Sequence, residues 1–293
     1  MSEQVLDRGL VRPADAPLLG LSFSMRLQKI GLNPTLLAGL LLLAFVILVA
    51  LCAPLLTPYD PIVQNLADAF KPPLSPGHPL GTDNFGRDVW SRIVWSTRLD
   101  LQIGLFSVAF PFLFGSFIGI ATGYLGGRLD TLFMRLVDVL MAFPFLVLVV
   151  AIMSILGPGL INLYITVGLV GWIPYARITR AETLATRSLE YVQAARIIGC
   201  TTPRIMLRHI LPNAIAPGLI YVFTGMVLAI LTGATLSFLG LGPQPPTPEW
   251  GAMIAAGRQF LLIGWWMTAL PGFALLIVGV ALSLIGDGLA DKR

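Results

Sequence analysis

Long apolar runs without a charged side chain constrain this sequence more than any other feature. A helix crosses a bilayer in about 20 residues, and it satisfies its own backbone hydrogen bonds where lipid offers none. Six runs are long enough: residues 34–56, 101–124, 139–156, 160–176, 214–238 and 265–285. The sequence therefore predicts an all-α integral membrane protein with six transmembrane helices.

The distribution of basic residues predicts how these helices are oriented. Lysine and arginine accumulate in the cytoplasmic loops of membrane proteins. If the N-terminus is inside, the outer segments hold only five of the 19 basic residues, namely Lys71, Arg87, Arg92, Arg98 and Arg258. We therefore expect both termini to be cytoplasmic, as a tail at residues 1–33 and a short end at residues 287–293.

Composition also points to lipid as the main surroundings of the chain. Charged residues make up 12% of the sequence, hydrophobic residues 56%, and the mean hydropathy is +0.83. A soluble protein carries about 25% charged residues. The net charge of +4 follows from the basic inner segments. We therefore expect contact with the lipid bilayer and no binding of nucleic acid.

The sequence offers no set of residues suited to catalysis or to a metal ion. Its two histidines, His78 and His209, fall on opposite sides of the membrane in the predicted topology. None of the lysines Lys29, Lys71 and Lys292 follows the glycines that a phosphate-binding Walker A loop requires. We therefore expect no catalytic residue, no metal site and no bound cofactor, with any ATP and Mg²⁺ held by separate ATPase chains.

The charged side chains all lie outside the six runs. Ion- and proton-coupled transporters usually place an ionisable side chain near the middle of the membrane, so the sequence argues against that class. Sodium bound by the carbonyls of broken helices stays open as an alternative. The runs contain Gly104, Gly115, Gly119, Gly225 and Gly233, and glycines of this kind more often let helices pack closely.

A long inner segment, residues 177–213, joins the fourth and fifth runs and is rich in arginine. It fits a helix, a break and a second helix: Glu190 favours a first turn, Gly199 suits a left-handed end, and Pro212 ends or kinks the second helix. Ala194 and Ala195 are small enough to let another surface approach. A helix of about 10 residues is marginal alone, so we expect it to pack on this chain or a partner. A helix lying on the membrane surface is the alternative.

The same segment resembles the coupling loop of ABC importer permeases, which docks into a groove on the ATPase subunit. The residues that match are Ala194, Ala195, Gly199, Leu211 and Pro212. Two positions depart from the family pattern: Gln193 stands for the usual glutamate, and His209 for the usual isoleucine. Further segments resemble the C-type permeases of the dipeptide, oligopeptide and nickel importers, and they are residues 78–88, 123–130, 134–138, 142–144 and 238–251.

The resemblance spans about residues 34–290 and implies a type I ABC importer permease fold with a cytoplasmic coupling helix. It implies a permease core at residues 101–286, with the helix at 34–56 as an addition and residues 57–100 outside. The implied partners are a homologous second permease, two ABC ATPases and an extracytoplasmic substrate-binding protein, in the bacterial inner membrane. The implied function is ATP-driven import of di- or oligopeptides or a similar small polar solute. Nickel and glutathione also stay open as substrates.

Two outer segments carry further candidate residues. Asp83 and Asp88 flank a turn at Gly86, and we expect Asp83 to cap a helix whose solvated face carries Arg87, Asp88 and Arg92. A contact with a substrate amine is the alternative. The stiff segment 243–249, which contains Pro246 and Glu249 and precedes Trp250, could form an outer gate or contact a binding protein. A rigid re-entry into the outer surface is its alternative.

The translocation path should be lined by small or polar residues of the second to fifth runs. The candidates are Ser107, Ser154, Asn162, Thr166, Thr224, Thr232 and Thr235. Serine and threonine in such helices also commonly bond to their own backbone. A secondary transporter or channel that works without an ATPase is the competing class, and it predicts transport by this chain alone. A membrane scaffold, which predicts no transport, is a third.

Overall fold

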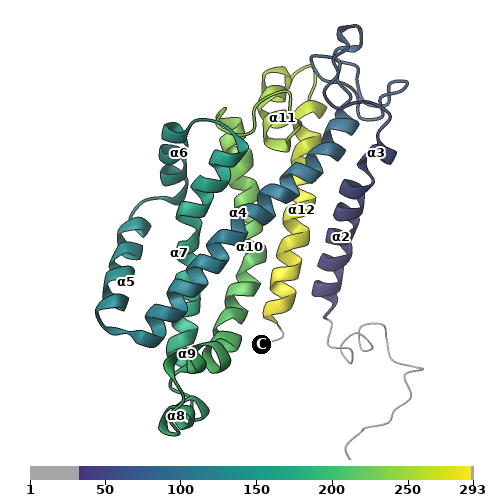
Figure 1. Ribbon diagram of the computed structural model, residues 1–293. Helices are drawn as coiled ribbons and strands as arrows, with labels where there is room; N and C mark the ends of the chain where they lie inside the picture. Colours follow the sequence, from purple (N-terminus) through teal and green to yellow (C-terminus); the bar gives the residue numbers. More distant parts are fainter. Residues whose placement is uncertain (1–32, 292–293) are drawn as a thin grey trace, which may run out of the picture.

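The computed structural model describes residues 33–291, and helices make up its framework (Figure 1). The α-helices are α2 (Pro34–Leu51), α3 (Ala53–Leu56), α4 (Val89–Leu125), α5 (Gly127–Met141), α6 (Phe145–Leu156), α7 (Leu160–Thr186), α8 (Glu190–Ile197), α9 (Thr202–Ile205), α10 (Leu211–Phe238), α11 (Trp250–Gly257) and α12 (Trp266–Ala290). Shorter turns are η1 (Leu66–Asp68), η2 (Met206–Ile210) and η3 (Arg258–Phe260). The predicted tail, apart from Asn33, lies outside the described residues.

Several of these helices have the length and apolarity of a membrane span. Within residues 33–291 there are four: α2, α4, the continuous stretch Thr202–Phe238 and α12. The pair α5 and α6 would make a fifth, although its two halves meet at 88°. The expected third span, 139–156, therefore contains a break: it takes in the end of α5 and all of α6. Proline lacks the N–H that a helix needs, and α6 begins directly after Pro144. The expected number of six spans stays a prediction.

Helix α4 begins twelve residues before the predicted second span and contains Arg92, Arg98 and Asp100. The charge-free run is thus only the later part of a 37-residue helix. The charged side chains are accommodated because they meet polar groups of neighbouring segments. The guanidinium of Arg98 donates to the carbonyls of Ala50 and Leu51 at the end of α2, at 2.5 and 3.1 Å.

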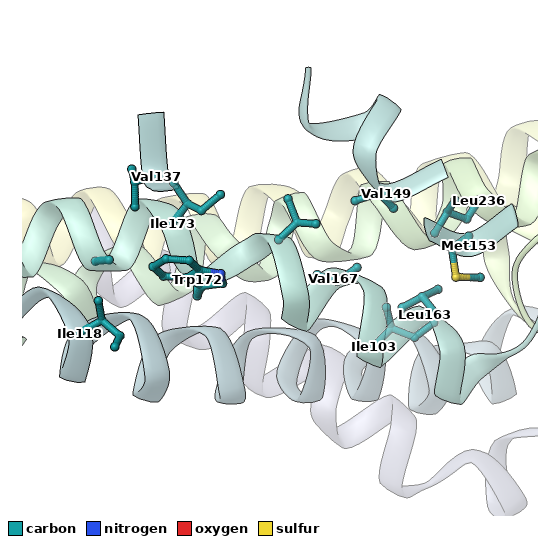
Figure 2. Close-up of a cluster of buried hydrophobic side chains, with 12 residues drawn as sticks. Ile103, Ile118, Val137, Val149, Met153, Leu163, Val167, Trp172, Ile173 and Leu236 are labelled. Atoms are coloured by element: carbon teal, nitrogen blue, oxygen red, sulfur yellow. The ribbon is translucent and has the colours of Figure 1, made fainter. Parts of the chain in front are cut away.

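The centre of the bundle is the packing of α4 against α7. Figure 2 shows Ile103 and Ile118 of α4 facing Val167 and Trp172 of α7, within a larger buried apolar cluster. Side chains of α5, α6 and α10 complete that cluster. Helices approach this closely only where side chains are small, and α4 presents Gly119 to the backbone of α7.

Figure 1 shows that different segments lie at the two ends of the helical bundle. Helices α8 and α9 lie at one end, together with the start of α2 and the end of α12. The loop 57–88 and helix α11 lie at the other end. The two segments that the sequence marks as functional are therefore held at opposite ends of the helical bundle.

Candidate functional site

The candidate coupling segment, residues 190–212, is anchored to the bundle by its buried face. Val192 and Ala195 of α8 belong to an apolar cluster with Ile120 and Tyr124, which lie in the last turns of α4. The guanidinium of Arg196 also lies over the Tyr124 ring, 5.6 Å from its centroid. Because α8 is fixed to the end of α4, a displacement of α8 would be passed directly to that helix.

The opposite face of α8 is exposed and carries polar residues such as Gln193 beside apolar ones. Ala194 lies on this face, and Ile197 and Ile198 at the end of the helix are 85% and 78% exposed. Gly199 follows with a φ of +84°, in the left-handed region that glycine adopts without strain. Exposed isoleucines outside the spans indicate a protein contact, because exposing large apolar side chains to water is unfavourable. The alanine pattern pointed to this helix but not to its two isoleucines.

The other predicted coupling residues shape the segment. Glu190 is exposed in the first turn of α8, where a carboxylate interacts favourably with the helix dipole. Leu211 and Pro212 form the first turn of α10, so Pro212 neither ends nor kinks a preceding helix by itself. A π-helical turn at Met206–Ile210 precedes it instead. Such turns accommodate an irregular hydrogen-bond ladder and are frequent at functional sites.

At the other end of the bundle, loop 57–88 forms a polar network that is buried. Asp88, not Asp83, caps α4, by accepting hydrogen bonds from the Ser91 N–H at 2.8 Å and the Ser91 hydroxyl at 2.7 Å. Asp83 instead pairs with Arg87 at 2.6 Å and lies 3.8 Å from Arg92. These four charged side chains are all buried, so the expectation of a solvated helix face was wrong. Mutual pairing explains how they can be buried.

His78 and Asp68 extend this network to the surface. The His78 Nδ1 lies 3.0 Å from an Asp88 carboxylate oxygen, and its Nε2 lies 3.7 Å from Asp68. A hydrogen bond from the Lys71 ammonium lowers the pKa of the half-buried Asp68 carboxyl. Each of these groups already has a partner within the chain, which indicates a structural role for the loop.

Gly86 makes the turn of this loop possible. Its φ is +71°, and a Cβ added there would lie 1.7 Å from the Asn65 carbonyl oxygen. We therefore expect Gly86→Ala to lower the free energy of unfolding by about 2 kcal/mol. Alanine is strained in the left-handed conformation, and its Cβ would displace the part of the loop around Asn65. Gly240→Ala is the matched control, because Gly240 has a φ of +81° but open space around its Cα. Equal losses of melting temperature in detergent for both variants would contradict the steric part of this account.

The segment before α11 is anchored by Glu249 and Trp250, both buried. The Glu249 carboxylate caps α11, accepting from the N–H groups of Gly251 at 2.8 Å and Ala252 at 2.7 Å. The Trp250 ring donates to the Ile93 carbonyl of α4 at 3.2 Å. Pro246 is exposed and therefore available for a partner, whereas Glu249 and Trp250 are not.

Asp100 of α4 lies buried beside this cap and was not among the predicted site residues. Its Oδ2 accepts a hydrogen bond from the backbone N–H of Trp250 at 3.3 Å. Its Oδ1 finds no hydrogen-bond donor among residues 33–291, although the carboxyl lies close to that of Glu249. Two neighbouring acid groups are therefore enclosed at the contact of α4 with α11.

This arrangement predicts opposite effects for two substitutions of Asp100. Asp100→Asn retains an acceptor for Trp250 and places an amide donor beside Glu249, so the melting temperature in detergent should stay equal or rise. Asp100→Ala leaves the backbone N–H of Trp250 without its acceptor, which should lower the free energy of unfolding by about 1–3 kcal/mol. A lower melting temperature for Asp100→Asn than for Asp100→Ala would contradict this reading of the acid pair.

Four of the seven candidate path residues lie on three different helices, α6, α7 and α10. Ser154 and Thr232 donate to carbonyls of their own helices, Val150 at 2.8 Å and Leu228 at 2.7 Å. Asn162 closes the turn between α6 and α7 by donating to the Leu156 carbonyl at 2.8 Å and the Gly157 carbonyl at 3.1 Å. Thr224 is exposed on α10. Their role in a path stays a prediction.

Comparison with protein families adds to this geometry. Residues 115–292 match the model of the binding-protein-dependent transport system inner membrane component. Residues 30–73 match the N-terminal TM domain of oligopeptide transport permease C. The expected division into a core at 101–286 and an additional helix at 34–56 stays a prediction.

Curated relatives cover most of the chain. It is 42% identical over 269 residues to a di/tripeptide transport system permease protein DppC of Pseudomonas aeruginosa, covering 90% of this chain and 89% of the relative. It is 44% identical over 254 residues to a putative peptide transport system permease of Brucella suis, covering 86% and 85%. A glutathione transport system permease protein GsiD of Pectobacterium atrosepticum is 38% identical over 254 residues, covering 87% and 84%.

A solved structure shows the same fold. This structure is of the MetNI methionine ABC transporter in inward-facing conformations. The present chain aligns with it at a TM-score of 0.54 and 20% sequence identity. The alignment covers 70% of this chain and 96% of the other. Together with the family match and the relatives above 40% identity, this places the chain in the family of binding-protein-dependent transport system inner membrane components.

Proposed function

We propose that this chain is one permease subunit of an ATP-driven importer that carries di- or tripeptides, or a similar small polar solute, across the bacterial inner membrane. The observation that carries the proposal is the candidate coupling segment, whose exposed isoleucines lie on a helix fixed to the end of α4. The peptide class is supported by the relatives, which include di/tripeptide and putative peptide permeases. The relatives also include a glutathione permease, which supports the wider class of small polar solutes.

In this proposal the complete importer contains a homologous second permease, two ABC ATPases and a substrate-binding protein. The ATPases bind ATP and Mg²⁺. The end of the bundle with α8, α9, the start of α2 and the end of α12 faces the cytoplasm, which agrees with the excess of basic residues in the inner segments. The loop 57–88 and the exposed Pro246 then face outward, where the binding protein delivers its solute.

Energy transfer follows from the packing of α8. When ATP binding brings the two ATPases together, each carries its docked coupling segment with it. The cluster of Val192 and Ala195 with Ile120 and Tyr124 transmits this displacement to α4. Helix α10 moves with it because Ile210 and Ala214 belong to the same cluster. Packed helices shift as units, so a movement at one end changes access at the other.

The test is uptake by the complete importer in proteoliposomes. Vesicles that contain this chain, its second permease and the ATPases should accumulate a labelled dipeptide only with ATP and the loaded binding protein. Vesicles that contain this chain alone should accumulate none. Uptake by the isolated chain without ATP would instead establish the secondary transporter or channel. No uptake of any solute by the complete assembly would favour a scaffold.

A further inference from the structure

A cavity of about 280 Å³ lies within the bundle, between α4, α7 and α10. Its walls are mostly apolar, and none of the described residues that line it carries a charge. Two lining residues, Phe145 of α6 and Leu228 of α10, are 40% and 49% exposed, so the cavity reaches the surface between those helices. Its volume is close to the lower end of the ~300–1,000 Å³ of small-molecule sites.

Two buried hydroxyls in this cavity lack a partner. The Ser107 and Tyr175 side chains both line it, and they are 1% and 2% exposed. Neither hydroxyl finds a hydrogen-bond partner among residues 33–291. A buried hydroxyl without a partner is unfavourable, because it has given up its hydrogen bonds to water and gained none in return. The pair therefore marks a place where a polar group from outside the chain would be stabilised.

Prolines add acceptors at the same place. Pro111 of α4 and Pro174 of α7 both line the cavity, and each lies inside its helix. A proline supplies no N–H to the carbonyl four residues earlier, which is that of Ser107 in α4 and of Val170 in α7. Of these two residues Ser107 lines the cavity, so its carbonyl, which receives no N–H from Pro111, adds an acceptor beside the hydroxyls.

We propose that this cavity is a binding site for one residue of a transported peptide, holding its uncharged side chain among the apolar walls and its peptide group at Ser107 and Tyr175. The inference rests on the proposed function and adds the location and chemistry of a solute site within the membrane. An acyl chain of a lipid would fill the apolar volume but would leave both hydroxyls unpaired. A peptide group supplies one donor and one acceptor, as the two hydroxyls require.

Of the seven predicted path residues, Ser107 is the one that lines this cavity. Ser154 and Thr232 already donate to their own helices, so they have little left to offer a solute. Tyr175 was not among the candidates because a tyrosine in a span resembles ordinary aromatic core. Its ring does pack edge-on against Phe112 and Tyr221, at 5.7 and 5.2 Å between centroids. The distinguishing feature is its hydroxyl, which points toward Gly225 of α10.

The experiment compares two tryptophan variants of α10 in the complete reconstituted importer. Leu228→Trp places a large ring at the proposed site. Leu231→Trp is the matched control, since Leu231 is 48% exposed, one turn further along, and lines a different cavity between α10 and α12. Uptake of alanyl-alanine and of alanyl-phenylalanine is measured with saturating, loaded binding protein, so that the permease step limits the rate.

We expect Leu228→Trp to slow uptake of alanyl-phenylalanine about tenfold while alanyl-alanine changes less than about twofold, because only the larger side chain needs the filled volume. Leu231→Trp should leave both rates within about twofold. A second pair tests the hydroxyl without adding bulk: Tyr175→Phe should slow both peptides by about three- to tenfold, and Tyr164→Phe, on the same helix outside the cavity, should not.

The outcomes separate the site from the function. If the unaltered importer takes up both peptides and Leu228→Trp and Tyr175→Phe behave like their controls, the cavity is not a solute site, although the peptide function stands. If the unaltered importer takes up neither peptide, the peptide function fails and this inference fails with it. Binding of each variant to its ATPase shows that the altered chains still assemble.

Discussion

Replacing Ile197 by aspartate should abolish capture of the ATPase subunits and, with it, ATP-driven uptake. The side chain is 85% exposed at the end of α8, next to Ile198 and away from the face that packs on α4. Large exposed anchors at the centre of an interface typically contribute 2 kcal/mol or more. A buried, unpaired carboxylate in an apolar groove adds a desolvation penalty. Affinity should therefore fall by at least about 30-fold.

The measurement is the amount of ATPase retained by an affinity tag on this chain in mild detergent. Leu262→Asp is the matched control, because Leu262 is 102% exposed but lies between α11 and α12 at the opposite end of the bundle. Retention of ATPase by the Ile197 variant at the level of the Leu262 variant would show that α8 is not the docking surface. The melting temperatures of both chains should match that of the unaltered chain.

Two other positions of the segment test its shape rather than its contacts. Proline cannot adopt the φ of +84° found at Gly199, so Gly199→Pro should also eliminate ATPase capture. Ala195→Arg should act through misfolding of the segment, because Ala195 belongs to the buried cluster. Ala194→Arg leaves that cluster intact and obstructs only the exposed face. Docking is therefore tested more directly at Ala194 than at Ala195.

This distinction shows how far the sequence could predict the segment. Glu190, the alanines and Gly199 predicted a short helix and its break at the right residues, whereas the predicted effect of Pro212 was wrong. The pattern could not show which alanine faces outward, because that depends on how α8 is rotated against α4. Ile197 and Ile198 were missed for the same reason: apolar residues in a short helix read equally well as its buried face.

The charged residues of the outer loop were assigned the wrong environment. Asp83, Arg87, Asp88 and Arg92 are spaced as on a solvated helix face, and local spacing is identical when the charges pair with one another inside the fold. Their burial depends on segments distant in sequence, such as the Pro61 carbonyl, which accepts from the Arg92 Nη1 at 2.8 Å. Apolar runs likewise predicted most spans, but not the extension of α4, since Arg98 is accommodated by the end of α2.

A single methyl group on Gly119 should destabilise the whole bundle. A Cβ at this position would lie 2.2 Å from the Thr179 hydroxyl oxygen and 2.3 Å from the Ala176 carbonyl oxygen, both in α7. The carbonyl belongs to the helix backbone and cannot turn away, so α4 and α7 must separate. Their contact holds the central apolar cluster, in which Ile118 and Trp172 are buried. Losing that packing should cost about 3 kcal/mol, because overpacked cores strain their neighbours.

Gly119→Ala should therefore lower the melting temperature in detergent by roughly 5–10 °C. Gly272→Ala is the matched control, since Gly272 lies inside α12 and a Cβ there would meet nothing within 4 Å. Alanine forms helices better than glycine by about 1 kcal/mol, so the control should be as stable as the unaltered chain or more so. Helix propensity alone thus predicts a higher melting temperature for both variants, whereas helix packing predicts a lower one for Gly119→Ala only. A gain at Gly119 would mean that α4 and α7 do not meet as closely as their glycine contact requires.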